Sequence, residues 1–267
     1  VGQPGAEHLA LAGALLAAMP EGLALAARQP TGAQGIIYAL LLASDPAARR
    51  RQLECLRASD DPVPAAETQK AMLMLGAMTD EHRLPLAAIA VRSLKSLSAE
   101  EYRRFRETVD AFVAADNEVD LFEFALLRTI KRRLAPAFGE KPANPAIRYR
   151  KPGAVLPVCR DLLSCLAYWG TYEAMEQDAA YRKGMEKLTG AGSAPDMLPV
   201  ADCTLPTVET ALDQLAHASP RLKKTILDAC AACIAADGRT TVAESELLQA
   251  IADALDCPMP PIVTRPS

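Results

Sequence analysis

The sequence contains one ten-residue pattern twice, and this repeat constrains the fold more than any other feature. Residues 114–123 read AADNEVDLFE, and residues 235–244 read AADGRTTVAE. A constant offset of 121 residues aligns the two copies without a gap and also matches apolar positions on either side. Self-similarity of this kind marks a duplicated supersecondary unit. We therefore expect two copies of one helical hairpin.

The residues around both copies predict a chain built from helices. Alanine and leucine are abundant, aromatic residues make up 4% of the chain, and runs of β-branched residues are scarce. This composition favours helix over strand. Ser98 and Glu101 have the spacing of a capping box that opens a helix, and apolar residues then recur at helical spacing up to Val113. The predicted fold class is all-α, a helical bundle.

Apolar stripes and turn residues place further helices along the chain. We expect them at residues 9–18, 21–28, 31–43, 46–58, 67–78, 86–97, 158–168 and 172–187, with a turn at 60–64 and a loop at 189–206. Five prolines at residues 135–157 interrupt helix repeatedly. The sequence therefore predicts an N-terminal helical domain at 1–134, a proline-rich linker at 135–157 and a C-terminal helical domain at 158–267, each domain with one copy of the hairpin.

Net charge and missing motifs exclude several classes of function. The formal charge of −4 argues against nucleic acid as the main partner, because phosphate binding needs a basic face. The chain has no His-Glu-x-x-His, no Gly-x-Ser-x-Gly, no phosphate-binding loop and no dinucleotide-binding glycine pattern. Its three histidines are isolated from one another in the sequence. We therefore expect no catalytic activity from this chain, with an unrecognised enzyme as the remaining alternative.

The cysteines favour a structural role. Seven cysteines are an odd number in a chain large enough to build its own core, which favours a reducing compartment. Cys230 and Cys233 have the spacing of a redox pair or of half a zinc site, but no second pair or nearby histidine completes a zinc site. Both lie on the apolar stripe of a predicted helix with Ile226 and Ile234. We therefore expect them to pack in the core.

The repeated acidic turn has two interpretations, and the first is structural. A helix ends at Asp116 or Asp237, and the next residue, Asn117 or Gly238, adopts the left-handed conformation that these residue types tolerate. The following helix is then capped in the same way in both copies. The capping residues are Asp120 and Thr241, and Glu123 and Glu244 close a capping box three residues later.

In the second interpretation the acidic turn binds a divalent cation. The dipole of a helix opposes a carboxylate at its C-terminal end, and a cation held there would offset this cost. The turn is not an EF-hand loop, because the glutamate follows the first aspartate by seven residues. The candidate metal ligands are Asp116, Asp120, Glu123, Asp237 and Glu244. No other cofactor is predicted.

These residues resemble the TerB-like family, helical bundles whose hairpins carry the pattern Ala-x-Asp-Gly-x-Val-x-x-x-Glu. The second copy follows the pattern except at Thr240, and the first copy keeps Val119 but has Asn117 in place of glycine. The resemblance implies two TerB-like repeats joined by the proline-rich linker. It also implies an acidic module linked to metal handling or to membrane-associated stress complexes.

Short phrases along most of the chain resemble the C-terminal region of bacterial membrane zinc metallopeptidases of the HtpX and CAAX-prenyl-protease type. They lie at residues 33–42, 83–86, 97–102 and 257–261. In those proteins a catalytic domain with transmembrane helices precedes a TerB-like cytosolic extension. The resemblance therefore implies a fragment of a longer protein, which would explain a sequence that begins at Val1 rather than at methionine.

From this resemblance we expect a non-catalytic cytosolic regulatory or protein-interaction domain of a membrane zinc metallopeptidase. The expected partner is another protein or the parent peptidase domain, and the membrane is reached only through the parent segment. The expected location is the cytoplasmic face of a bacterial inner membrane. The alternative function is an acidic TerB-like metal-binding module.

Overall fold

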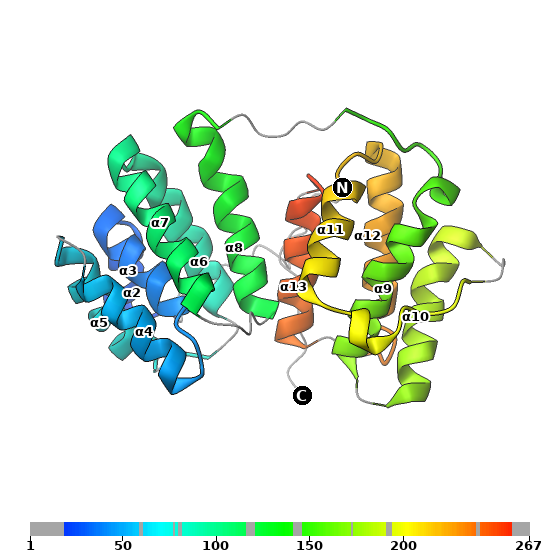
Figure 1. Ribbon diagram of the computed structural model, residues 1–267, viewed down its shortest axis with the longest axis horizontal. Coiled ribbons are helices and arrows are strands. Elements are labelled where there is room, and N and C mark those ends of the chain that lie inside the picture. Colours follow the sequence, from blue (N-terminus) through cyan, green and yellow to red (C-terminus); the bar gives the residue numbers. More distant parts are fainter. Residues whose placement is uncertain are drawn as a thin grey trace. The chain divides into compact units, whose positions relative to one another are not determined.

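The protein is all-α (Figure 1). The computed structural model describes residues 19–58, 61–76, 78–79, 82–115, 121–140, 146–171, 173–190, 194–238 and 241–257. Every regular element among these residues is a helix, apart from an isolated β-bridge between Tyr149 and Ala218. Internal contacts divide the chain between Pro142 and Ala143 into an N-terminal unit and a C-terminal unit. The predicted fold class is therefore confirmed.

The N-terminal unit is built around one buried helix, α3. Its helices are α2 (Glu21–Ala27), α3 (Pro30–Leu40), α4 (Pro46–Arg57), α5 (Val63–Leu75), α6 (Arg83–Ser93), α7 (Ala99–Ala115) and α8 (Leu121–Leu134). α3 packs against α2, α5 and α6, while α4 packs against α7 and α6 against α8. Gly35 permits the close approach of α3 and α5, because a Cβ atom at this position would lie 2.6 Å from the backbone carbon of Glu67.

An aromatic cluster fills the core of the N-terminal unit beside α3. The ring of Tyr38 lies 5.5 Å from the ring of Phe105 and 5.6 Å from that of Phe112, measured between centroids. All three side chains are almost completely buried. Tilted aromatic pairs at such distances add to the free energy gained from burial alone. The cluster therefore fixes α7 against α3.

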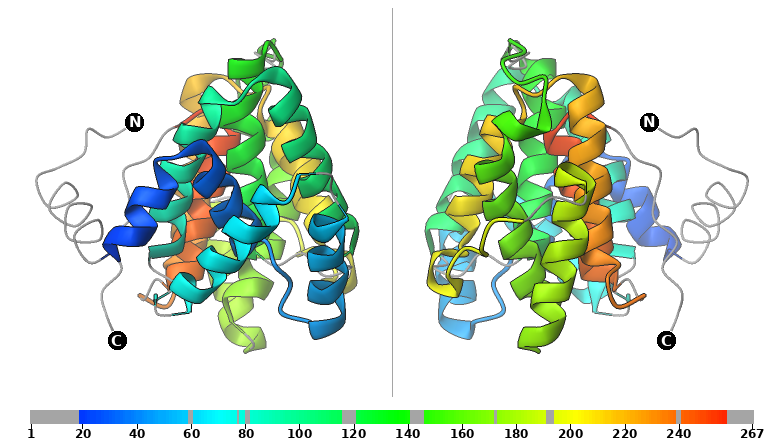
Figure 2. Two further views of the ribbon diagram at one scale, coloured as in Figure 1. Left: turned by 90° about the vertical axis from the view of Figure 1, so that its left-hand side faces the viewer. Right: turned by 90° about the vertical axis from the view of Figure 1, so that its right-hand side faces the viewer.

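The C-terminal unit is also built around one buried helix, α9, and Figure 2 shows its helices from two further sides. Its helices are α9 (Leu156–Gly170), α10 (Ala174–Thr189), α11 (Leu205–Leu215), α12 (Pro220–Ile234) and α13 (Val242–Ala254). α9 packs against α10, α11 and α12, and α10 also packs against α12. Cys230 and Cys233 are buried in this core, as their apolar stripe predicted.

Two helices begin at positions where the sequence predicted a turn or a loop, and a proline lies near the start of each. α5 begins at Val63, inside the predicted turn at 60–64. The predicted loop at 189–206 is also too long, because α11, which the pattern did not predict, begins at Leu205. Pro64 and Pro206 lie in the first turns of these helices, where a missing N–H leaves no helical hydrogen bond unmade. The helix predicted at 9–18 lies outside the described residues.

The proline-rich segment at 135–157 is ordered at both of its described ends. Residues Ala135–Phe138 form a 3₁₀ helix directly after α8, and the ring of Phe138 stacks on that of Tyr102 with centroids 3.9 Å apart. On the other side of the unit boundary, the backbone N–H of Arg148 donates to the carbonyl of His217, and that of Ser219 donates to the carbonyl of Tyr149. Each described end therefore belongs to the unit against which it packs.

Candidate functional site: an acidic cavity at a helix corner

The second copy of the repeated pattern forms the corner between α12 and α13. α12 ends at Ile234, and Gly238 has a φ of 78° in the turn that follows. Thr241 then caps α13. Its Oγ1 accepts a hydrogen bond from the backbone N–H of Glu244 at 3.2 Å, and its own N–H donates to Oε2 of Glu244 at 2.8 Å. The capping box and the left-handed glycine predicted for this copy are therefore confirmed.

The sequence predicted that the first helix of this hairpin ends at Asp237, and this prediction is wrong. The helix stops at Ile234, because the backbone leaves helical geometry at Ala235 and continues through tight turns, with the N–H of Gly238 donating to the carbonyl of Ala235. Asp237 is exposed in this turn, three residues beyond the helix. Because the effect of a helix dipole falls off within the last turn, Asp237 carries little of the electrostatic cost that a bound cation would offset.

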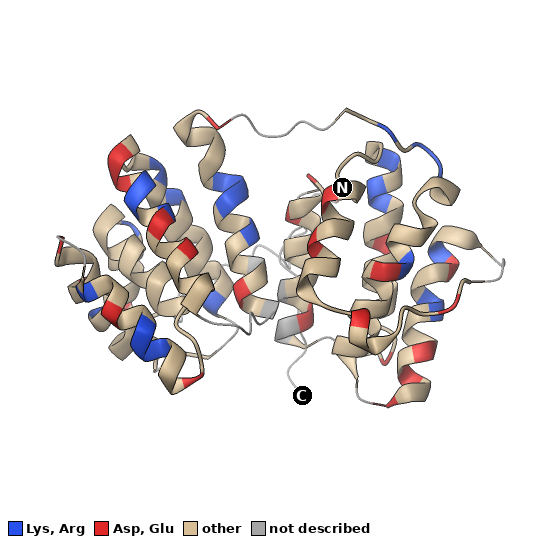
Figure 3. Ribbon diagram, viewed as in Figure 1, with Lys and Arg blue, Asp and Glu red and all other residues tan. Residues whose placement is uncertain are grey.

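A cavity of about 220 Å³ opens at this corner of the C-terminal unit. Its apolar walls come from the ends of α9 and α12 and from the first half of α10, and three carboxylates line it as well. The apolar lining residues are Leu166, Ala167, Ala179, Ala180 and Ile234, the acidic ones are Glu176, Asp237 and Glu244, and Gly170, Thr171, Cys233 and Ala236 complete the lining. Figure 3 shows the acidic residues at the start of α10 in red.

Two of these carboxylates each use one oxygen to hold the surrounding structure. Oε2 of Glu244 accepts from both the N–H and the Oγ1 of Thr241, whereas Oε1 faces Gly170 at 3.2 Å from where a Cβ atom would lie. Oε2 of Glu176 likewise accepts from Oγ1 of Thr171 at 2.7 Å. The local fold thus fixes both glutamate side chains in place beside the cavity.

The electrostatic character of the cavity is negative. None of the described residues that line it is a lysine, arginine or histidine. Burial, together with the nearby charge of Glu244, raises the pKa of the Cys233 thiol to about 12, so this thiol stays protonated at neutral pH and is a poor nucleophile. A cationic group of α10 also lies at the corner, since Nζ of Lys183 donates to the carbonyl of Ala236 at 2.7 Å.

The first copy of the pattern lies partly outside the described residues. Asp116 and Asp120 fall in the undescribed segment 116–120, while Glu123 is half-buried in the first turn of α8. The capping box predicted at the start of α7 is present, since the N–H of Ser98 donates to Oε2 of Glu101 at 2.7 Å and the N–H of Glu101 donates to Oγ of Ser98 at 3.2 Å.

In the N-terminal unit a buried glutamine of α4 joins the end of α3 to α7. The Nε2 of Gln52 donates to the carbonyls of Leu41 and Phe112, both at 3.2 Å, and its Oε1 accepts from the N–H of Ala43 at 2.8 Å. Phe112 aligns with Cys233 at the repeat offset of 121. Arg51 also donates to the carbonyl of Ala115 at 2.7 Å, which parallels the contact of Lys183 with Ala236.

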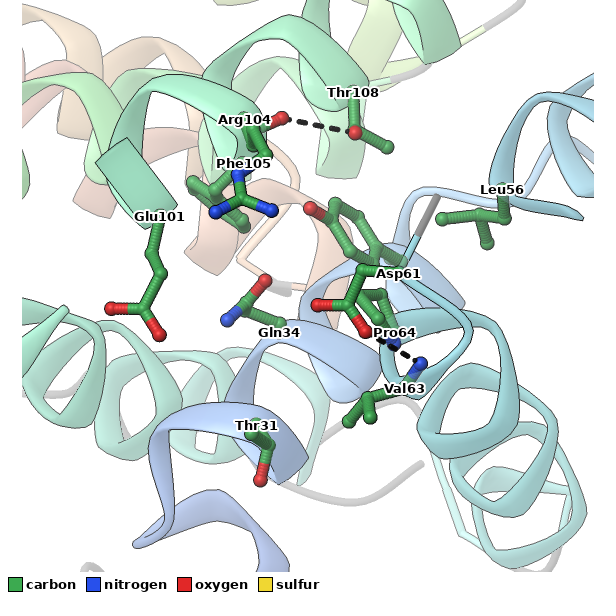
Figure 4. A pocket seen from close by; sticks show the side chains of 11 residues that line it. Thr31, Gln34, Leu56, Asp61, Val63, Pro64, Glu101, Arg104, Phe105 and Thr108 are labelled. Carbon is green, nitrogen blue, oxygen red and sulfur yellow. Dashed lines mark hydrogen bonds between the residues drawn. The ribbon is translucent and has the colours of Figure 1, made fainter. Parts of the chain in front are cut away.

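The N-terminal unit has a smaller cavity of about 60 Å³ between α3, α5 and α7 (Figure 4). Several of its polar groups already have local partners. Oδ1 of Asp61 accepts from the N–H of Val63 at 3.0 Å, and Oγ1 of Thr108 donates to the carbonyl of Arg104 at 3.0 Å, as Figure 4 shows. Because this cavity is smaller and its lining includes Arg104 as well as the carboxylates of Asp61 and Glu101, it is the weaker candidate site.

The structure brings together two of the five predicted metal ligands. Asp237 and Glu244 line the same cavity, and Glu176, which the sequence analysis missed, lines it with them. Within the described parts of the chain, no three His, Cys, Asp or Glu side chains are arranged as metal ligands. Cation binding at Asp116, Asp120, Glu123, Asp237 and Glu244 therefore stays a prediction.

Comparison with known proteins gives no relative from which a function could be transferred. No protein family, curated protein or solved structure matches the chain. Among the helices that the structure describes, none is both long enough and apolar enough to cross a membrane. The corner of the C-terminal unit thus remains the candidate functional site.

Proposed function

We propose that this chain is a non-catalytic interaction module that binds a partner protein through the cavity at the α12–α13 corner. The observation that carries the proposal is the mixed lining of that cavity, with apolar walls beside three carboxylates. Concave apolar sites with a few fixed polar groups are typical of binding sites. The protonated, buried thiol of Cys233 offers no nucleophile there, which favours binding over covalent chemistry.

The resemblance to the C-terminal region of membrane zinc metallopeptidases extends the proposal. On that basis the module is the protein-binding part of a membrane zinc metallopeptidase and lies at the cytoplasmic face of a bacterial inner membrane. The two-repeat TerB-like architecture belongs to the same proposal. It is supported by the buried central helix in each unit and by the basic side chains that donate to the aligned carbonyls of Ala115 and Ala236.

Peptide selection tests the interaction function directly. The immobilised chain is offered a random displayed peptide library, and the selected peptides are tested against Ala179→Leu, which fills the cavity from α10, and against Ala66→Leu, an exposed alanine of α5 in the other unit. We expect Ala179→Leu to abolish peptide binding and Ala66→Leu to preserve it. Failure to enrich any peptide, or equal binding by both variants, would overturn the proposal.

The second candidate function is an acidic metal-binding module, and one observation favours it: Asp237 and Glu244 line the same cavity. A cation that binds only the folded chain raises its melting temperature. Melting is therefore measured with Mg²⁺, Ca²⁺ and Zn²⁺ for the wild type, Asp116→Ala and Asp237→Asn. A rise in the wild type that either variant loses would support this function, and indifference to all three cations would reject it.

A further inference from the structure

We propose that the cavity at the α12–α13 corner receives a lysine side chain from the partner. This inference rests on the proposed interaction function and adds the chemistry of the ligand. The occupant must satisfy two features of the lining together, an apolar wall and a negative charge. A lysine side chain has both complementary parts, since its aliphatic stem packs on apolar surface while its ammonium stays with polar groups.

The apolar part of the lining is formed by small side chains from helices that are distant in sequence. Ala167 on α9 and Ala179 and Ala180 on α10 leave the space open, and Leu166 and Ile234 add larger apolar surfaces. An unbranched aliphatic stem fits such a wall without needing a polar partner along its length. Burial of this stem supplies the part of the affinity that does not depend on charge.

The carboxylates favour an ammonium over a guanidinium. Oε2 of Glu244 is held by Thr241, and Oε2 of Glu176 is held by Thr171. Each glutamate therefore presents its remaining oxygen as a single acceptor rather than as a matched pair. A guanidinium reaches its full strength with two oxygens of one carboxylate, whereas an ammonium directs three donors towards separate acceptors.

Charge complementarity also favours a cation from outside the chain. Among the described residues of the lining, three are carboxylates and none is cationic. Lys183 lies at the corner, but its ammonium donates to the carbonyl of Ala236 at 2.7 Å, in the turn that follows α12. The remaining oxygens of Glu176 and Glu244 can therefore accept from an ammonium of the partner.

The experiment uses a defined probe, the peptide acetyl-Gly-Lys-Gly-amide, with norleucine and arginine peptides for comparison. Binding to the full chain is followed by NMR of the methyl groups of Leu166, Ala180 and Ile234. We expect saturable shifts with the lysine peptide, binding about tenfold weaker with norleucine, which lacks the charge, and intermediate binding with arginine. Higher salt should weaken the lysine peptide more than the norleucine peptide.

Matched variants separate the charge of the cavity from its structure. Glu244→Gln and Glu176→Gln remove the charge but keep an oxygen that can accept from Thr241 and Thr171, since glutamine also closes a capping box. Each should weaken the lysine peptide about tenfold. Glu101→Gln makes the same change in the capping box of α7, in the other unit, and should leave binding unchanged.

Three outcomes would overturn the inference; the first and the third would leave the proposed function standing, and the second would favour the metal-binding alternative. Norleucine could bind as well as lysine, which would make the site purely apolar. Mg²⁺ or Ca²⁺ alone could produce the same methyl shifts, which would make the occupant a metal ion. Sedimentation could show a dimer that Ala179→Leu dissociates, which would make the occupant a second copy of this chain. Failure of the peptide selection would instead remove the proposed function itself.

Discussion

The two units differ in the side chains that surround two aligned residues, Phe112 of α7 and Cys233 of α12. In the N-terminal unit the space beside the central helix is closed by Gln52 and Phe112, with Tyr38 packed against the phenylalanine. In the C-terminal unit the aligned residue is Cys233, and the space beside it is the cavity. Among the described residues, the space beside Phe112 is therefore filled by side chains of its own unit, whereas the space beside Cys233 has room for a group from another molecule.

A repeated turn therefore does not by itself define a repeated site. A basic side chain donates to the aligned carbonyls of the two copies, Arg51 to Ala115 and Lys183 to Ala236. The two copies differ in neighbouring residues outside the repeated pattern. Substitutions at those neighbours should therefore change the comparison most.

The greatest loss of stability should follow from creating a cavity at Phe112. Phe112→Ala should lower the free energy of unfolding of the N-terminal unit by about 3–5 kcal/mol, because it removes a fully buried aromatic ring. The aligned change, Cys233→Ala, removes one sulfur atom beside an existing cavity and should cost about 1 kcal/mol. Hydrogen exchange resolved by peptide measures each unit separately. Equal losses in the two units would contradict the comparison.

The second-largest loss of stability should follow from replacing the buried amide of Gln52. Gln52→Leu should cost about 3 kcal/mol, because it leaves two carbonyls and one N–H buried without their partner. Lys183→Met in the other unit removes one exposed hydrogen bond and should cost less than about 1 kcal/mol. Urea unfolding followed by hydrogen exchange checks both values. A loss from Lys183→Met as large as that from Gln52→Leu would contradict this ranking.

Alkaline pH should weaken the C-terminal unit first. Burial raises the pKa of Cys159 and of Cys233 from an ordinary value of 9 to about 12. The unfolded chain loses these protons at lower pH than the folded chain, so stability is complete below about pH 9 and falls as the pH rises towards 12. By pH 10 the loss should be on the order of 1 kcal/mol for each thiol.

The single tryptophan, Trp169, lies in α9, so its fluorescence during urea unfolding reports on this unit. Cys159→Ala should make the decline between pH 9 and 10 shallower. In the N-terminal unit burial raises the pKa of Tyr38 above its ordinary value of 10, so the corresponding loss should begin about one pH unit higher. A C-terminal stability that stays constant from pH 8 to pH 10 would contradict this expectation.

The weakest effect concerns two capping boxes that lie at different places in the repeat, that of Glu101 at the start of α7 and that of Glu244 at the start of α13. Glu101→Ala and Glu244→Ala should each cost about 0.5–1 kcal/mol, because each removes one half of a capping box. The glutamine variants should cost less than the alanine variants at both positions. Thermal melting of the four variants checks this, and a glutamine variant that costs as much as its alanine variant would contradict the expectation.

The sequence predicted those features that depend on neighbouring residues. The capping boxes at Ser98 and Thr241 and the left-handed glycine at Gly238 follow from side chains a few residues apart, and all three are present. The helical class follows from composition and periodicity. The starts of α5 and α11 were missed because proline was interpreted as a helix breaker, although both prolines lie in first turns.

The cavity could not be predicted in the same way. Ala167, Ala179 and Glu176 lie far from the repeated pattern in sequence, and only tertiary packing brings them to Glu244. A weak signal was present, since Gly170 and Thr171 interrupt two helical stripes next to a glutamate. Small residues are equally common in tightly packed cores, so their identity alone does not distinguish a cavity from a close helix contact.

The hydrogen bonds of Gln52 also bear on the order in which the chain folds. This side chain joins residues close in sequence, Leu41 and Ala43, to Phe112, which lies sixty residues further on. Such non-local contacts raise the entropic cost of closing the intervening chain. During synthesis, α3 and α4 therefore emerge before the aromatic residue that completes their packing. The N-terminal unit should reach its native core only after α7 has left the ribosome.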